Sequence, residues 1–582
     1  MLVTLRPGTP QGRLTSPWRA AAIVLLGLAV LACGSPPQRA AESRAQGGAV
    51  AQQPAIKRIT LGVLGDPPVL FNSIGTASGA DDTGEELVSR GLVEADDTRT
   101  FRPLLAEDIP TIENGLWQVF PDGRMQTTWR IKPGIVWHDG APYTSADLLF
   151  TVQAVLDREL PLTRRAAYSS IEGAEAPDER TITVRWTKPY IEADTFFSRE
   201  LALPLPKHIL ERPATEDKAN FEHLPYWTEA FVGTGPFRLE QSDLGVPVLL
   251  RANERYVLGR PKIDEIEFKI FPDVKVLTTN ILAGAADLSL GRGFDYDQAV
   301  VLEQQWRDGS VASRFSGSQV IYSQFLGTSP QIVGDVNFRR ALLQAIDRPQ
   351  LNEQFLGGRG LVSHVFLGPQ EPEFSYIEQS VVRYDYDPRR AQTALEALGY
   401  TRGPDGTFRD ATGERLLVEL RSDPEDGSQR PMFAVADSWQ RLGVGVDPVV
   451  IPRQRTRELD YLYTFPAFHL RSHSGRISSA LSNYQSSSQP MPENRWVGNN
   501  RSHYVNADLD AAADRYLVTI PPQERYRELQ TVMRIITDQL PVMSLYYDPS
   551  FSAIGNRLDN FIPSKASGTA AKTWNSHLWD VK

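Results

Sequence analysis

The feature that most constrains this chain is that its 582 residues contain a single cysteine, Cys33. A lone thiol cannot close an intramolecular disulfide, and it cannot supply a metal site built from several thiolates. The fold must therefore be held together by buried apolar side chains and hydrogen bonds. A chain of this length exceeds what one hydrophobic core supports, so two or three domains are expected.

The residues before Cys33 have the composition of a secretory leader. Three arginines precede an apolar run over residues 20–32, and no acidic residue occurs in this segment. The run is shorter than the roughly 20 residues that span a bilayer, which favours a signal peptide over residues 1–32. The segment VLAC resembles the bacterial lipobox, which implies lipidation of Cys33; the alternative is an inert cysteine in an ordinary signal peptide. Residues 33–55 are rich in Gly, Ser, Pro, Ala and Gln, and we expect a flexible tether.

Charge and motifs exclude several function classes. The formal net charge is -10, whereas proteins that bind nucleic acid need basic patches, so no nucleic-acid partner is predicted. The usual nucleophile, phosphate-binding and zinc-protease motifs do not occur. His469 and His473 lie four residues apart in FHLRSHSG, which we interpret as a loop, and a catalytic metal normally needs a third protein ligand. We predict no catalytic residue, no metal and no cofactor.

Strand and helix patterns alternate along the chain, which predicts a mixed α/β class. Residues 58–64 and 181–186 have the β-branched content of strands, and residues 125–140 suggest two short strands separated by a Pro-Gly turn. Helical stripes begin after Thr144, after Asp387, and near residue 523. In VGTGPF, Gly233 and Gly235 would allow tight turns.

Eight ordered segments carry a stronger signal. They are FRPLLAEDIP with the following DGRMQTTWRIKPGIVWHDGAPYTSADLLFTVQAVLD, GTGPFRLEQ, LLRANERYVLGRPKIDEIEFKIFPD, ILAGAADLSL, VNFRRALLQAIDR, YDPRRAQTALEALGY, RSHYVNADLDAAADRYL and ERYRELQTVMRIITDQLPVMSLYY. Together they resemble the family 5 extracellular solute-binding proteins, the oligopeptide and dipeptide receptors of bacterial ABC importers. In VNFRRALLQAIDR, an apolar stripe from Phe338 to Ala345 would face the core, with Arg339 and Arg348 away from it.

The resemblance implies a two-lobed periplasmic-binding-protein fold with an extra third domain and a ligand cleft between the lobes. Lobe 1 would be discontinuous, and a subdomain inserted in it would pack against it. The implied boundaries are 56–92, 221–308 and 550–582 for lobe 1, 93–220 for the subdomain and 309–549 for lobe 2. The segments VIYSQFLGTS and VMSLYYDPS would cross between the lobes and serve as hinges.

The resemblance also implies where a ligand would be contacted. The turn after the first strand, the segment ending at residue 292, the crossing strands and a later loop would contribute. The candidates are Asp66, Pro68, Val69, Arg292, Tyr322, Gln324, Phe325, Arg471, His473, Arg476, Tyr546 and Tyr547. For the tyrosines, packing in the core is the alternative, and for Arg471 it is a position on a solvent-facing loop.

One departure from the family pattern bears on the ligand. Peptide receptors of this family often carry an aspartate that pairs with the free amine of the peptide, but no acidic residue occurs between Asp460 and Glu493 here. Arg471, His473 and Arg476 occupy that region instead. Arginines repel a cationic amine and attract oxyanions, so the ligand is not an ordinary peptide or its acidic end lies here.

The resemblance implies a monomeric, extracytoplasmic receptor. It would be held at the cell membrane by a lipid on Cys33, and it would deliver a peptide or other small polar solute to the permease of an ABC transporter. The alternative is an extracytoplasmic enzyme, or a signalling or adhesion protein, derived from the same fold.

Overall fold

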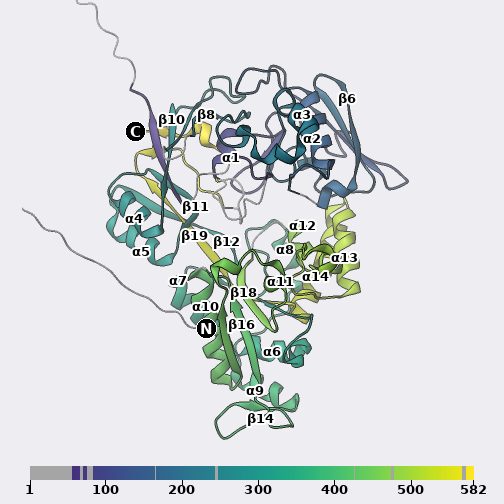
Figure 1. The fold of residues 1–582 in the computed structure, drawn as a ribbon, viewed down its shortest axis with the longest axis vertical. Helices are drawn as coiled ribbons and strands as arrows, with labels where there is room; N and C mark the ends of the chain where they lie inside the picture. Colours follow the sequence, from purple (N-terminus) through teal and green to yellow (C-terminus); the bar gives the residue numbers. More distant parts are fainter. Residues whose placement is uncertain are drawn as a thin grey trace, which may run out of the picture. The chain divides into compact units, whose positions relative to one another are not determined.

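A mixed sheet of eleven strands brings together segments that are far apart in the sequence (Figure 1). The computed structural model describes residues 55–65, 70–74, 83–163, 166–242, 247–424, 426–473, 477–565 and 572–582. Across the sheet the strands are β17 (Gly445–Val450), β16 (Leu417–Ser422), β18 (Phe468–His473), β12 (Gly309–Ser323), β19 (Val542–Gly555), β11 (Leu288–Phe294), β1 (Arg58–Leu64), β10 (Glu265–Phe271), β9 (Val248–Ala252) and β8 (Phe237–Gln241), and β13 (Leu361–Val362) pairs with β19.

Strands β12 and β19 join the two halves of this sheet. They pair antiparallel from Gly309 and Gly555 to Tyr322 and Val542, with register shifts after Phe315 and after Gln319. At one end β19 pairs with β11, and at the other end β12 pairs with β18. The strand that pairs with the outer edge of this two-stranded ribbon therefore changes along its length. The change occurs at about residues 313–318 of β12 and 547–551 of β19.

This arrangement corrects one of the two predicted crossings. Residues 320–323 already pair with β18, and β12 ends at Ser323, so the stretch 320–329 does not cross. The change of neighbours occurs earlier, because β12 is a 15-residue strand that begins at Gly309. The second predicted stretch, 542–550, does include the change in β19.

Helices cover both halves of the sheet. Apolar residues of α10 pack on β16 and β18, with the Trp439 and Phe468 rings 5.0 Å apart, and α4 and α5 share a buried cluster with Phe551 of β19. The helices are α1 (Thr83–Val88), α2 (Ser145–Leu156), α3 (Lys207–Glu216), α4 (Val274–Leu282), α5 (Tyr296–Gln305), α6 (Val336–Gln344), α7 (Arg348–Leu356), α8 (Phe374–Ile377), α9 (Pro388–Ala397), α10 (Asp426–Leu442), α11 (Leu459–Tyr463), α12 (Ile477–Ala480), α13 (Ala507–Val518) and α14 (Pro522–Gln539). None of these helices, which belong to the described residues, has the length and apolar content needed to cross a membrane.

A second sheet of four antiparallel strands lies within residues 93–220. Its order is β4 (Trp117–Val119), β5 (Met125–Arg130), β7 (Thr181–Trp186) and β6 (Ile171–Asp178). The predicted strand pair over 125–140 is half right, because β5 is present but Val136 forms only an isolated bridge with Pro142. Smaller pairs are β2 (Val93–Ala95) with β3 (Phe101–Pro103), β14 (Thr401–Arg402) with β15 (Phe408–Arg409), and β20 (Leu558–Asp559) with β21 (Asp580–Val581).

Most of the predicted elements are confirmed. Strands β1 and β7 and helices α2, α9 and α14 occur where the patterns placed them, and the Asp387 side chain caps α9 by accepting from the Arg390 backbone N–H. Gly233 and Gly235 of VGTGPF are needed for close packing rather than for the tight turns that the sequence predicts. A Cβ at Gly233 or Gly235 would lie 2.0 Å from the Val88 carbonyl oxygen or 2.4 Å from the Val88 carbonyl carbon, so they permit close approach to the end of α1.

Two arginines of the 336–348 segment are buried, contrary to the prediction. Arg339 is 2 % exposed, and its guanidinium donates to the carbonyl oxygens of Val333 and Gln539. Arg348 is 3 % exposed and donates to the carbonyls of Ser363 and Ser544. Burial lowers the pKa of each guanidinium to about 10. Both side chains therefore use their charge to satisfy backbone acceptors inside the fold.

Candidate functional site

The structure describes only some of the predicted contact residues. Asp66, Pro68, Val69 and Arg476 lie outside the described residues, as does the predicted lipidation site Cys33, and Arg292 lies in β11 with its side chain undescribed. Tyr322, Gln324, Phe325, Arg471, His473, Tyr546 and Tyr547 are all described.

A row of polar side chains occupies one face of β16 and β18 near their carboxyl ends. Phe468 and Leu470 point into the core beneath α10, so the alternating residues His469, Arg471 and His473 lie on the opposite face. This corrects the interpretation of FHLRSHSG as a loop, because residues 468–473 form β18 between β16 and β12. Polar groups at the carboxyl ends of neighbouring parallel strands are a common basis for ligand sites.

Asp423, directly after β16, links two members of this row. His469 Nε2 donates to Asp423 Oδ1 at 3.1 Å, and Arg471 Nε lies 3.3 Å from Asp423 Oδ2. Burial tends to raise the pKa of Asp423, but the His469 hydrogen bond and the Arg471 charge outweigh it and hold that pKa below its usual value. Burial lowers the pKa of His469. On the neighbouring strand Arg421, which is in register with His469, is also on this face, but it is 8 % exposed and pairs with Glu419.

The Arg471 guanidinium is the accessible cation of the row. Its side chain is 25 % exposed, and Asp423 is its ion-pair partner among the described residues. That contact uses Nε, and no hydrogen bond from either Nη to a described residue is present. Two parallel N–H groups remain available, which is the arrangement that binds a carboxylate or phosphate bidentately.

His473 is buried at 5 % exposure and is held neutral. Its Nδ1 lies 2.6 Å from the Tyr322 hydroxyl, and the Phe366 ring packs 4.6 Å from it. Burial lowers the pKa of His473 to about 3 and raises that of Tyr322 to about 12, so the hydroxyl keeps its proton and donates to Nδ1. His473 Nε2 is buried without a hydrogen-bond partner among the described residues.

The other predicted contact residues, in the stretches 320–329 and 542–550, are buried or half-buried. Tyr546 is 1 % exposed, and the Tyr547 hydroxyl donates to the Val365 and Leu367 carbonyls. Gln324 is fully buried and donates to the Tyr463 carbonyl. Phe325 is half-buried, with the Arg339 guanidinium over its ring.

Sequence reasoning missed Asp548 in β19. Its carboxylate accepts from Gln319 Nε2 at 3.1 Å, and burial raises its pKa to about 6. Asp548 pairs with Gly317 at the register shift of β12, where both long strands change their neighbours. The available signal is that Asp548 is the one acidic residue of β19, in the segment VMSLYYDPS that the resemblance implies to cross between the lobes.

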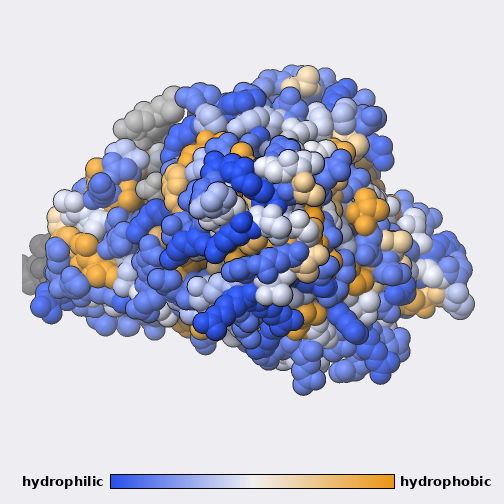
Figure 2. Space-filling view, turned by 90° about the horizontal axis from the view of Figure 1, so that it is seen from below, coloured by the Kyte–Doolittle hydropathy of each residue, from blue (hydrophilic) through white to orange (hydrophobic). Residues whose placement is uncertain are grey.

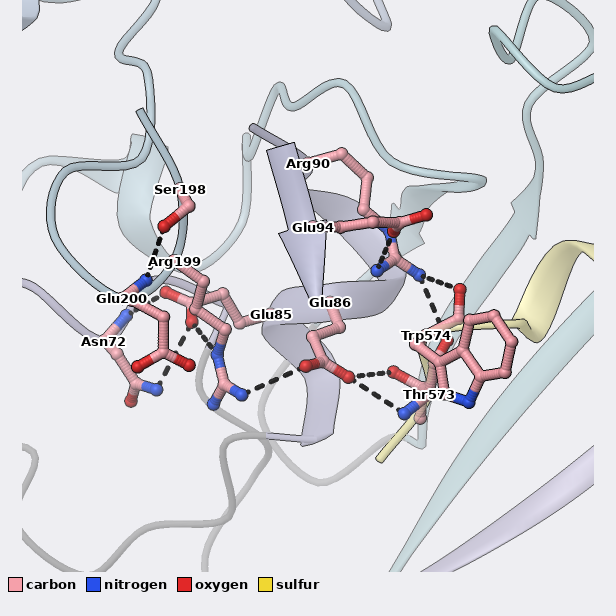
Figure 3. Close-up of polar contacts among 10 residues, drawn as sticks. All are labelled: Asn72, Glu85, Glu86, Arg90, Glu94, Ser198, Arg199, Glu200, Thr573 and Trp574. Carbon is pink, nitrogen blue, oxygen red and sulfur yellow. Dashed lines mark hydrogen bonds and ion pairs between the residues drawn. The ribbon is translucent and has the colours of Figure 1, made fainter. Parts of the chain in front are cut away.

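A buried ionic network around α1 holds Asn72, which lies between β1 and α1 in the sequence (Figure 3). Glu85 of α1 accepts from the Asn72 backbone N–H at 2.6 Å and from Arg199 Nε at 2.6 Å. Glu86 accepts from Arg199 Nη1 at 3.1 Å and from the Thr573 backbone N–H at 2.8 Å. The segments that contain Asn72, Arg199 and Thr573 therefore meet on α1. Among them, Asn72 is only a few residues after the predicted contact turn at 66–69.

Comparisons with known proteins agree on one family. The sequence profile described as "Bacterial extracellular solute-binding proteins, family 5 Middle" matches residues 100–498. The chain is 23 % identical to the oligopeptide-binding protein AppA of Bacillus subtilis over 526 residues, which cover 86 % of this chain and 88 % of AppA.

Solved structures show the same fold. The structure of Bacillus subtilis AppA with a nonapeptide has a TM-score of 0.70 at 19 % identity and covers 90 % of this chain and 99 % of AppA. NikZ from Campylobacter jejuni, in complex with Ni(L-His), has a TM-score of 0.72 at 18 % identity and covers 90 % and 99 %. One fold thus accommodates a peptide in one protein and a metal chelate in another.

Proposed function

This chain belongs to the bacterial extracellular solute-binding proteins of family 5 and has their two-lobed α/β fold, and on that premise we propose that it is a lipid-anchored receptor for an anionic solute. The ligand is a small molecule or peptide with a carboxylate or phosphate. It binds between the lobes and is handed unmodified to an ABC permease. The observation that carries the ligand class is the exposed part of the Arg471 guanidinium at the end of β18.

The lobe boundaries form part of this proposal. Lobe 1 comprises 56–92, 221–308 and 550–582, the inserted subdomain 93–220, and lobe 2 residues 309–549. The change of strand neighbours near residues 313–318 and 547–551 supports a hinge there. A hinge at strand ends lets the lobes close on a ligand. Asp548 and Gln319 lie at this hinge.

The charges on the β16 and β18 face support an anionic ligand. Asp423 neutralises part of the Arg471 charge through Nε, so both Nη groups stay available for a ligand. His469 and His473 are neutral near pH 7, because burial lowers the pKa of both. Arg421 on the same face is buried, pairs with Glu419 and donates to the Tyr461 carbonyl, so Arg471 is the group that recognises an oxyanion.

A thermal melting screen of the full chain tests the proposal. Peptides, dicarboxylates, phosphate esters and metal chelates are added over a concentration series. A true ligand raises the melting temperature progressively with its concentration, because it adds about 2.7 kcal/mol to the free energy of unfolding at 100 times Kd. We predict that Arg471→Ala weakens binding by about 1.5 to 3 kcal/mol, because a charge-assisted hydrogen bond is lost.

The matched control is Arg457→Ala, which removes an exposed arginine outside the polar row and should leave affinity unchanged. Small-angle scattering with the ligand should show a more compact particle. Equal affinity in the wild type and in Arg471→Ala, or a ligand whose positive amine proves essential, would contradict the anionic class.

A further inference from the structure

A surface groove lies at the end of the fold that carries α9 and the β14–β15 hairpin, and it shares no residue with the candidate site. The C-terminal ends of α6 and α10 and the first turn of α9 form it, and its volume is about 250 Å³. Pockets for drug-sized ligands occupy roughly 300–1,000 Å³, so this groove suits a smaller molecule. The view from this end shows a mostly hydrophilic surface (Figure 2).

Three arginines, Arg389, Arg402 and Arg441, line the groove together with one carboxylate, that of Asp347. The Asp347 carboxylate accepts from the Gln350 backbone N–H, which caps α7. The lining therefore has an excess of positive charge in a protein whose formal net charge is -10. Concave surfaces with one sign of charge concentrate the field on a bound ion of the opposite sign.

Two of these guanidinium groups are not neutralised by an ion pair. Arg402 donates to the Gly406 carbonyl at 3.0 Å and to the Leu442 carbonyl at 2.8 Å. These neutral acceptors hold the side chain without cancelling its charge. Arg389 forms no ion pair with a described carboxylate, whereas Arg441 is 3.0 Å from Asp437, one turn earlier on α10.

The remaining lining residues fit an organic group beside the anion. Tyr386 is 49 % exposed and presents an aromatic surface, and Gln392 and Ser438 add polar groups. We propose that this groove is a second binding site, specific for a phosphate ester. Arg389 and Arg441 bind the phosphate oxygens through their guanidinium forks, Arg402 contributes fixed charge, and Tyr386 packs against the organic part.

Such a phosphate ester has two possible sources, a free organic phosphate or the headgroup of an anionic lipid. The first arm of the test titrates the full chain with glycerol 3-phosphate, with inorganic phosphate and with citrate, by isothermal calorimetry. We expect saturable binding of glycerol 3-phosphate that weakens at least tenfold in the Arg389→Ala/Arg441→Ala double variant. Arg390→Ala removes the neighbouring arginine, which does not line the groove, and should change affinity less than twofold.

The second arm measures sedimentation of the full-chain Cys33→Ser protein with phosphatidylglycerol and phosphatidylcholine vesicles. If the protein prefers phosphatidylglycerol vesicles and the double variant loses this preference, the ligand is a lipid headgroup. If the protein binds glycerol 3-phosphate but shows no such preference, the ligand is a free solute. Melting temperatures of the variants within 2 °C of the wild-type value exclude misfolding as the cause of lost binding. The proposal is overturned by no saturable binding in either arm, by equal loss in Arg390→Ala, or by binding of citrate alone.

Discussion

Asp548 is half-buried in β19, and its carboxylate has one side-chain donor among the described residues, Gln319. Burial raises its pKa from 3.8 to about 6, so folding favours the protonated acid. The stabilisation is complete below about pH 4, where both states are protonated, and it is lost as the pH rises through 6. A shift of two units corresponds to about 3 kcal/mol.

We therefore predict that Asp548→Asn increases the free energy of unfolding by up to about 3 kcal/mol at pH 7.5. At pH 3.5 the variant and the wild type should be equally stable, because the wild-type carboxyl is then protonated too. Urea unfolding at the two pH values measures the difference. A gain of the same size at both values would show that the amide acts by packing rather than by removing a buried charge.

The fate of the predicted contact residues shows what sequence patterns can and cannot supply. Arg471 could be selected from its charge and its place in the chain, and it lies on a strand end with Nη groups available. Tyr546 and Tyr547 could not be assigned in the same way, since a crossing strand has two faces and both rings pack inward. Asp548 was overlooked because its partner, Gln319, is more than 200 residues away in the sequence.

At the scale of elements, a buried arginine of α6 forms hydrogen bonds with the C-terminal end of α14. The Arg339 guanidinium of α6 donates to the carbonyl of Gln539, the last residue of α14, and to the Val333 carbonyl. The last four carbonyl groups of a helix have no hydrogen-bond donor within that helix. The Arg339 side chain supplies a donor to one of them across the contact between α6 and α14.

We predict that Arg339→Met lowers the free energy of unfolding by about 2 to 4 kcal/mol, because buried carbonyl acceptors lose their donors. Arg340→Met is the matched control. Arg340 donates to the carbonyl and the carboxylate of Asp538, but its side chain is 28 % exposed. Water can replace its bond to the carbonyl, and partly exposed ion pairs contribute about 0–1 kcal/mol. Chemical denaturation of both variants measures the contrast, and an equally small effect for Arg339→Met would mean that water replaces its hydrogen bonds.

Elements were predicted well where one periodicity prevails and poorly where strands are polar. Strand β7 was identified because Ile182, Val184 and Trp186 alternate on a fully buried face. Strand β18 was taken for a loop, since FHLRSH presents polar residues on the face that a core strand would fill with apolar ones. Its strand geometry comes from pairing with β16 and β12, and such long-range pairing leaves no local signature in composition.

At the scale of the whole molecule, the leader predicted over residues 1–32 bears on where the protein works. The basic residues, the short apolar run and Cys33 in VLAC predict a lipid-modified amino terminus, and two acyl signals anchor a protein where one chain gives marginal binding. We predict that Cys33→Ser moves the protein from the membrane fraction to the soluble fraction. Fractionation of cells expressing each form measures this, and full membrane retention of the variant would contradict lipid anchoring.

We propose above that this molecule captures an anionic solute at Arg471 and releases it chemically unchanged. Native mass spectrometry of the full chain, purified from its host without unfolding, tests this most directly. We expect a stoichiometric small molecule with a carboxylate or phosphate, recovered intact on denaturation and depleted in Arg471→Ala but retained in Arg457→Ala. A bound molecule without an acidic group, equal occupancy in both variants, or conversion of the bound molecule during incubation would contradict it.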